Sequence, residues 1–394
     1  MTMTKKTLDD VDVRGRRVLV RADLNVSMTD DGRVADDTRI RAALPTIQHL
    51  IDHGARVVVC SHLGRPKGER DSSLSLRPIA ERLGQLIGQD VEMADDCVGS
   101  AVEAQVEGLP SGRILLLENT RFHPEEKEND PGFAEQLARL AEVYVNDAFG
   151  TAHRAHASTE GVTHHVDRAV AGRLMVTELA AIEQAVERPE RPFVAIMGGA
   201  KISDKIGVIE RLCQKADRLL VGGGMANTFL KARGVDVGSS LAEDEALDEA
   251  KRLMDGLGET LVLPVDAVVA PEADADAERR TVSIDEVPSD WQILDIGPQT
   301  VTAFNGHLRD AKTVVWNGPM GVFELEPFAA GTFAMARTLA ELNAITVVGG
   351  GESCAAVYRA EVVEQLTHVS TGGGAFLTLL EGRELPGVAA LDDR

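Results

Sequence analysis

Arginine, histidine and other polar side chains recur directly after short apolar runs in the first half of the sequence. Four runs end in the clusters RADLN, SHLGRP, ENTRFH and NDAFGTAHRAH. These clusters contain Asp23, Asn25, His62, Arg65, Arg121 and Arg154, and Arg39 follows the first of them. A single arginine here is best explained by a surface salt bridge. Because guanidinium groups bind phosphate and carboxylate through two hydrogen bonds, basic groups at four matching positions instead predict a site for a small, strongly anionic metabolite.

Glycine runs take the place of the arginines in the second half. They occur in MGGAKISDK, GGGMAN, DIGP, WNGPMGVFE, GGGES and STGGG. Glycine allows a ligand to approach the backbone closely, and the amides at a helix N-terminus bind phosphate. One glycine pair after a strand is more often a turn, but six at successive strand ends predict a nucleotide site.

Two common nucleotide motifs are absent from the sequence. It contains no G-x-x-x-x-G-K-[ST], so a P-loop enzyme such as an adenylate kinase is excluded, and we see no actin-type pattern of the acetate kinase kind. The G-x-G-x-x-G pattern fails because Asn227 and Cys354 stand where its last glycine would be. An NAD-dependent dehydrogenase with tandem Rossmann domains is therefore the weaker alternative.

Alternating short apolar runs and helix-period stretches predict an α/β fold with mostly parallel sheets. Strands are expected at 17–25, 56–61, 113–118 and 143–147, and then at 192–197, 218–221, 260–263, 266–269, 313–316 and 345–348. Helices are expected at 38–53, capped by Asp36 or Asp37, and at 75–88. Residues 172–187 predict one uninterrupted helix that joins two domains, and residues 271–280 predict a solvated loop.

The composition is that of a folded protein of two domains. The chain has 394 residues, 44% of them hydrophobic and 26% charged, with a net charge of -22. This acidity argues against nucleic acid or an anionic membrane as a partner. No apolar run approaches a membrane span, and MTMTKKTLDD has no secretion signal. The four separated cysteines predict neither disulfides nor a zinc site, and they favour a reducing cytoplasm.

Two closely spaced histidine pairs could suggest a metal site. His153 and His156 are three residues apart, and His49 and His53 are four apart, without the glutamate of H-E-x-x-H. We interpret all four as loop or helix-face residues and assign no zinc to them.

From about residue 5 to the C-terminus, the ordered motifs resemble those of the phosphoglycerate kinase family. SHLGRP, NDAFGTAHRAH and WNGPMGVFE are long and highly specific. The resemblance implies two Rossmann-like domains that face a cleft and are joined by a helix. Residues 1–171 would bind 3-phosphoglycerate, 172–187 would form the joining helix and 188–384 would bind the nucleotide. Residues 385–394 would return to the first domain, in a monomeric cytoplasmic enzyme that closes by hinge bending.

The resemblance also implies an activity and its residues. The reaction would be reversible phosphoryl transfer from 1,3-bisphosphoglycerate to Mg-ADP, giving 3-phosphoglycerate and ATP. The glycerate would contact Asp23, Asn25, Arg39, His62, Arg65, Arg121 and Arg154. The nucleotide and its Mg²⁺ would meet Lys201, Lys205, Gly224, Gly297, Glu324, Gly350, Gly351, Glu352 and Ser353. An acyl phosphate needs little acid–base chemistry, so charge neutralisation by Arg39, Lys205, Gly372 and Gly373 is expected to carry the catalysis.

Three positions depart from the family pattern. Glu352 stands where the family generally has the aspartate that binds Mg²⁺, Ser27 replaces a proline, and Gln299 replaces a lysine. Glutamate keeps the charge and adds one methylene, so a changed metal geometry is expected rather than loss of the metal. The exchange gives slight support to a non-catalytic relative, against which the complete set of arginines and lysines weighs heavily.

Overall fold

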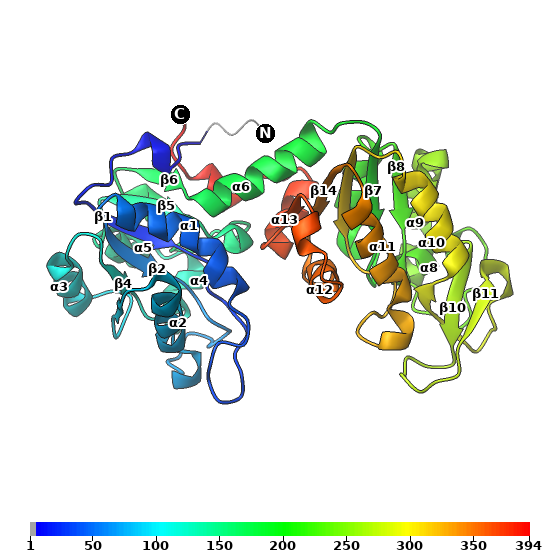
Figure 1. Cartoon of the computed structure of the whole chain (residues 1–394), viewed down its shortest axis with the longest axis horizontal. Coiled ribbons are helices and arrows are strands. Elements are labelled where there is room, and N and C mark those ends of the chain that lie inside the picture. The colour runs from blue at the N-terminus through cyan, green and yellow to red at the C-terminus, as the bar shows by residue number, and fades with distance from the viewer. Residues whose placement is uncertain (1–4) are drawn as a thin grey trace. The chain divides into compact units, whose positions relative to one another are not determined.

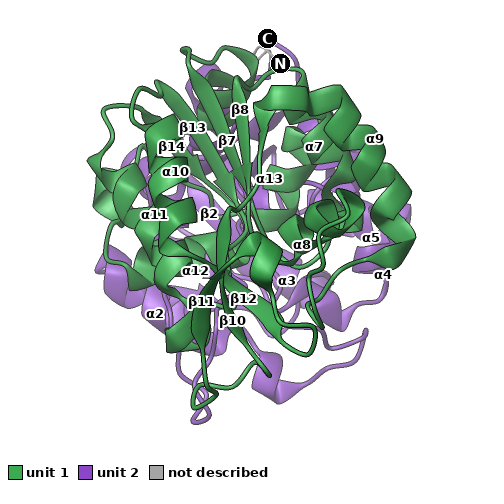
Figure 2. Cartoon of the chain, turned by 90° about the vertical axis from the view of Figure 1, so that its right-hand side faces the viewer, with its two compact units in different colours: residues 1, 181–383 green, residues 2–180, 384–394 purple. Residues whose placement is uncertain are grey.

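The computed structural model describes residues 5–394 and divides the chain into two compact units (Figures 1 and 2). The N-terminal unit ends at Ala180 and also contains Glu384–Arg394, and the C-terminal unit is Ala181–Arg383. The predicted first domain, 1–171, starts with residues 1–4, which lie outside the described residues. Within each unit, a parallel sheet brings together strands that are distant in the sequence.

The N-terminal unit is built on a six-stranded parallel sheet in the order β3-β4-β2-β1-β5-β6. Its strands are β1 (Arg17–Arg21), β2 (Arg56–Cys60), β3 (Val91–Met93), β4 (Ile114–Leu116), β5 (Val143–Asn146) and β6 (Ala169–Ala171). Its helices are α1 (Thr38–Asp52), α2 (Arg77–Ile87), α3 (Ser100–Gly108), α4 (Glu125–Glu128), α5 (Pro131–Ala138) and α14 (Pro386–Ala389). Buried valine, leucine and isoleucine side chains of β1, β2 and α1 form its core, as expected of strands covered on both faces.

The C-terminal unit contains a second six-stranded parallel sheet, in the order β15-β14-β13-β7-β8-β9. Its strands are β7 (Phe193–Met197), β8 (Arg218–Val221), β9 (Leu261–Val262), β13 (Thr313–Asn317), β14 (Ile345–Val348) and β15 (His368–Val369). Its helices are α7 (Ile206–Cys213), α8 (Gly223–Ala232), α9 (Leu247–Leu257), α10 (Pro298–Leu308), α11 (Ala330–Glu341), α12 (Gly351–Arg359) and α13 (Gly373–Leu380). The α/β class and the mostly parallel sheets predicted from the sequence are thus confirmed.

A separate antiparallel sheet corrects one strand prediction. The run 266–269 was expected to join a parallel sheet, but β10 (Asp266–Ala270) pairs antiparallel with β11 (Arg280–Ser283) and β12 (Gln292–Ile296). An apolar run does not reveal the direction of its partner. The short turn 271–279 leads straight from β10 into β11, which allows antiparallel pairing without a crossover helix.

The segment predicted as one helix over 172–187 is composite. It begins as α6 (Arg173–Ile182) and ends in a π-helical turn, Glu183–Glu187, and the boundary between the units falls within it. At its start, the buried Asp147 accepts hydrogen bonds from the backbone N–H groups of Leu174 and Met175, 2.9 and 3.2 Å away. At α1, Asp37 occupies the N-cap position, but its side chain makes no capping hydrogen bond and pairs instead with Arg41 and Arg82. The side chain of Asp36 accepts the Thr38 N–H.

None of the described helices combines the length and the apolar character that crossing a membrane would require.

Candidate active site

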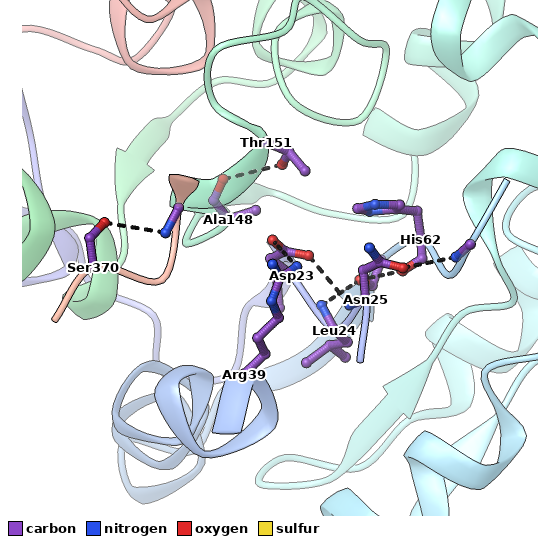
Figure 3. Close-up of polar contacts among 12 residues, drawn as sticks. Asp23, Leu24, Asn25, Arg39, His62, Ala148, Thr151 and Ser370 are labelled. Atoms are coloured by element: carbon purple, nitrogen blue, oxygen red, sulfur yellow. Dashed lines mark hydrogen bonds and ion pairs between the residues drawn. The ribbon is translucent and has the colours of Figure 1, made fainter. Parts of the chain in front are cut away.

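The carboxyl edge of the N-terminal sheet gathers the polar residues predicted from the sequence. Strand β1 ends at Arg21, not at Asn25 as expected, because the chain leaves the sheet and Leu24 N–H instead bonds Ser61 Oγ at 2.9 Å. Asp23 and Asn25 therefore lie on the loop after β1. Arg39, from the first turn of α1, reaches Asp23 through a 3.0 Å ion pair (Figure 3).

Gly64 joins two further predicted residues. Its N–H donates to Asn25 Oδ1 at 2.8 Å, and its carbonyl accepts from Arg121 Nη1, also at 2.8 Å. Gly64 has a φ of +61°, a conformation that favours glycine. The loop after β2 is thereby fixed to the loops after β1 and β4, and the next residue, Arg65, is exposed.

The basic groups at this edge lie close enough together to shift one another's pKa values. Burial, followed by the charges of Arg21 and Arg121, lowers the pKa of His62 well below its usual value. Burial, followed by the charges of Arg154 and Arg21, lowers the pKa of Arg121 to about 10. The Nε atom of Arg121 is also buried and has no hydrogen-bond partner among residues 5–394. Because the positively charged side chains of this site repel one another, binding of an anionic ligand is favoured.

Sequence reasoning missed four residues of this cluster. Arg21 is the buried last residue of β1, and His156 is a buried imidazole whose pKa burial and then Arg121 lower to about 4. Glu126 and Ser158 are fully buried behind them. A signal existed for Arg21, because an arginine inside an otherwise apolar strand must have a buried partner.

A cavity of about 260 Å³ lies among the glycine-rich loops of the C-terminal unit. Three predicted residues line it, namely Gly224, Glu324 and Glu352. The remaining lining is largely apolar or glycine and includes Gly199, Ala200, Gly223, Leu230, Leu241, Pro264, Ile293, Pro319 and Met320. Apolar walls with a few polar groups are typical of a small-molecule pocket, and a flat base fits such walls.

Six predicted nucleotide residues lie outside the lining of this cavity, namely Lys201, Lys205, Gly297, Gly350, Gly351 and Ser353. Gly297 is buried beside it, and the carboxylate of Asp266 fills the space where a side chain at position 297 would lie. Lys201 is exposed, and its charge adds to the hydrogen bonds from Ser203 and Ile202 that lower the pKa of Glu243 against the opposing effect of burial.

Lys205 lies beneath the loop that follows β7. Its Nζ donates to the Gly198 carbonyl at 2.7 Å and would be 2.7 Å from a Cβ placed on Gly318. Burial lowers the pKa of this ammonium group to about 8, against the opposing effect of Glu352 and then Asp204. A desolvated cation of this kind gains from a nearby anion.

Two helix N-termini meet near these loops. A Cβ on Gly373, the first residue of α13, would lie 3.5 Å from the backbone nitrogen of Gly351, the first residue of α12. Helix N-termini favour anions such as phosphate. Ser353 Oγ is already engaged by the Gly318 N–H at 2.5 Å, and Gly372 N–H donates to Ser370 Oγ at 3.2 Å (Figure 3). The amides at Gly350, Gly351 and Gly373 are the better anion donors.

The donor set at the cavity fits a hard divalent cation. Glu352 is exposed on the first turn of α12 and lines the cavity, where its carboxylate offers the oxygen ligand that Mg²⁺ prefers. Mg²⁺ is commonly held by one or two carboxylates together with substrate phosphates.

A second group, Asp96, Cys97 and His123, brings three possible ligand atoms within 4.8 Å of one another. His123 Nε2 and Asp96 Oδ1 are hydrogen-bonded at 2.7 Å, and Arg70 lies 4.0 Å from the same carboxylate. Burial raises the pKa of the Cys97 thiol well above its usual value. We therefore interpret this group as an internal hydrogen-bonded cluster.

Comparison with known proteins gives a consistent result. The family model described as phosphoglycerate kinase matches residues 8–383. Phosphoglycerate kinases of Chloroflexus aurantiacus and Pelotomaculum thermopropionicum are each 56% identical and cover 99% and 100% of the chain, which spans 100% of both. The solved phosphoglycerate kinases of Coxiella burnetii and Pyrococcus horikoshii align with TM-scores of 0.89 and 0.86 at 42% and 34% identity, covering 98% of each chain.

Proposed function

Since the chain belongs to the phosphoglycerate kinase family, and so transfers a phosphoryl group reversibly between 1,3-bisphosphoglycerate and ADP, we propose how its residues divide that task. The arginine cluster of the N-terminal unit binds the glycerate, and the glycine-lined cavity of the C-terminal unit binds the nucleotide. The observation that carries this assignment is the set of mutually repelling buried cations around His62 and Arg121.

On the glycerate side, the guanidinium groups of Arg39, Arg65, Arg121 and Arg154 are the proposed anion ligands. Arg39 is anchored by only one Nη atom to Asp23, and Arg121 by only one to Gly64, so each retains donors for a phosphate or carboxylate. Asn25 and His62 supply neutral polar groups beside them. These loops are cross-linked by Gly64, which supports a preformed site.

On the nucleotide side, the apolar part of the cavity accommodates the base and its polar end receives the phosphates. Gly224 and Glu324 line the cavity, while Gly297 supports it from behind through its close approach to Asp266. Lys201 is exposed enough to reach a phosphate, and the α12 and α13 amides add further donors. We assign Glu352 as the protein ligand of the Mg²⁺ that accompanies the nucleotide, where the ion neutralises phosphate charge.

The transfer step itself needs positioning and charge neutralisation. The attacking ADP phosphate oxygen has no proton to lose, and the leaving group is a carboxylate, so no general base is required. We assign Arg39 and Lys205 as the side chains that stabilise the charge on the transferring group, with amides of Gly373 and, once released from Ser370, Gly372.

In-line transfer also requires the two bound substrates to meet. We propose that bending of the segment around Ala180 and Ala181 brings them together and excludes water. Among residues 5–394, none of the four cysteines forms a disulfide, which supports a reducing cytoplasm as the site of action. Among residues 5–394, the large hydrophobic side chains that are exposed are only Leu241, Val265 and Tyr358, which supports a monomer.

A coupled assay tests this proposal. Purified protein supplied with 3-phosphoglycerate and Mg-ATP should form 1,3-bisphosphoglycerate, measured as NADH consumption by an added glyceraldehyde-3-phosphate dehydrogenase. Each substrate should also bind alone to its own unit, so 3-phosphoglycerate should perturb NMR signals of the arginine cluster and Mg-ADP those of the cavity. Perturbation of the cavity by 3-phosphoglycerate alone would contradict the assignment.

A further inference from the structure

Arg21 is a charged residue at the centre of the N-terminal sheet, and only 1% of it is exposed. Each of the three nitrogens of its guanidinium group contacts a neighbouring polar atom. Nε donates to Ser158 Oγ at 2.8 Å, Nη1 donates to the carbonyl of Ala22, and Nη2 lies 3.1 Å from His62 Nδ1. Arg21 therefore connects the imidazole of the glycerate site with a buried serine.

Glu126 completes this chain of contacts from the opposite side. The residue is fully buried in α4, and its two carboxylate oxygens accept the Ser158 hydroxyl at 2.6 Å and the Ser158 N–H at 2.9 Å. Since a serine hydroxyl has one hydrogen, its donation to Glu126 leaves Ser158 Oγ as an acceptor toward Arg21. Ser158 therefore links the carboxylate of Glu126 to the guanidinium group of Arg21.

The contact between Arg21 and His62 determines the form of the imidazole. A guanidinium group has donors only, so His62 Nδ1 must be the acceptor. In a neutral ring the single proton then resides on Nε2. Burial and the surrounding arginines keep the pKa of His62 low, so the ring is neutral at physiological pH.

We propose that Glu126, acting through Ser158 and Arg21, is a positioning residue that holds His62 in the Nε2–H tautomer and so presents a hydrogen-bond donor to the glycerate. This inference rests on the proposed function of the arginine cluster. It goes beyond that function because it assigns a role to two residues buried behind the site. A donor at Nε2 suits a ligand that carries only acceptors at that point, such as a carboxylate or phosphate oxygen.

The tautomer can be observed directly by NMR of ligand-free protein labelled with ¹⁵N-histidine, with the His62 signals assigned through His62→Asn. We expect Nδ1 to resonate as an unprotonated nitrogen and Nε2 as a protonated one between pH 6 and pH 8. The reverse tautomer, or a doubly protonated ring, would overturn the proposal. This measurement needs no substrate, so it is independent of the coupled assay.

Two variants test the route from Glu126. Glu126→Gln and Ser158→Ala should each introduce the second tautomer and raise the KM for 3-phosphoglycerate about tenfold, with kcat and the KM for Mg-ATP nearly unchanged. Glu128→Gln, an exposed neighbour on the same helix, is the matched control and should change none of these values. If both variants fold, as judged by circular dichroism, and retain the pure Nε2–H tautomer, Glu126 has no positioning role. Because Ser158→Ala leaves both charged side chains, Arg21 and Glu126, unchanged, it tests the route even if Glu126→Gln does not fold.

Discussion

Asp23 anchors Arg39 through a single ion pair, with 3.0 Å between Oδ2 and Nη1. The carboxylate side chain is 8% exposed and the arginine side chain 37%, so the anchor is buried while the guanidinium group still reaches solvent. A cation fixed in this way loses little conformational entropy when it interacts with a developing negative charge. The two residues therefore act as one preorganised group.

Removal of the Arg39 side chain should affect turnover more than binding. We expect Arg39→Ala to lower kcat by about 10²- to 10³-fold, with a smaller rise in the KM for 3-phosphoglycerate, as measured in the coupled assay. Arg41→Ala is the matched control, because Arg41 lies on the same helix, is exposed and pairs with Asp37. A near-normal kcat in Arg39→Ala would remove this residue from the transfer step.

Glu352 should control the affinity for the metal-bound nucleotide. We expect Glu352→Ala to raise the KM for Mg-ATP about tenfold or more and to leave the KM for 3-phosphoglycerate unchanged, because it removes the proposed carboxylate ligand. Glu352→Asp should restore most of the affinity. Glu364→Ala, an exposed acidic position outside the cavity lining, serves as the control. Titration of Mg²⁺ at fixed nucleotide separates metal binding from nucleotide binding, and an unchanged Mg²⁺ dependence would exclude Glu352 as a ligand.

The part of the site that was predictable from sequence is the part encoded by strand ends. Short apolar runs locate the parallel strands, and the carboxyl ends of such strands meet at one edge, which brought Asp23, Asn25, His62 and Arg121 together. The glycine runs similarly indicated the cavity lined by Gly224 and Glu352.

The residues that escaped prediction are those whose role depends on burial and on partners far along the chain. Glu126 lies in a run of acidic residues that is typical of a solvent-exposed helix surface. It is nevertheless fully buried, and its carboxylate accepts a hydrogen bond from Ser158, 32 positions later in the chain. The antiparallel pairing of β10 was unpredictable for a related reason, because strand direction is set by a partner and not by the strand itself.

Lys205 should impose a pH dependence on nucleotide use. Its pKa is about 8 in the free enzyme, so the ammonium group loses its charge as the pH rises through that value. The kcat/KM for Mg-ADP should therefore decline above about pH 8, since this parameter reports the ionisation of free enzyme. Lys205→Arg should move the decline to higher pH, whereas Lys201→Arg should leave it in place. A wild-type profile that stays flat to about pH 9.5 would refute the assignment.

Asp295 should make the stability of the C-terminal unit depend on pH. It is a buried residue of the cavity lining, where Gly331 N–H and Ile296 N–H donate to its two oxygens, and burial raises its pKa to about 7 despite these bonds. The pKa of Asp295 in the native state exceeds the unfolded value of 3.8, so between pH 3.8 and about 7 the native state binds a proton that the unfolded state does not. Proton binding to Asp295 therefore stabilises the native state at low pH, and this stabilisation is lost as the pH rises toward 7. The side chain of Asp295→Asn cannot titrate. The unfolding free energy of the wild type minus that of the variant should therefore decrease from pH 5 to pH 8. Urea unfolding of both proteins at several pH values measures this difference, and subtraction removes the effect of Asp147, whose pKa burial raises to about 6. A difference that stays constant over this range would show that Asp295 remains ionised in the folded protein.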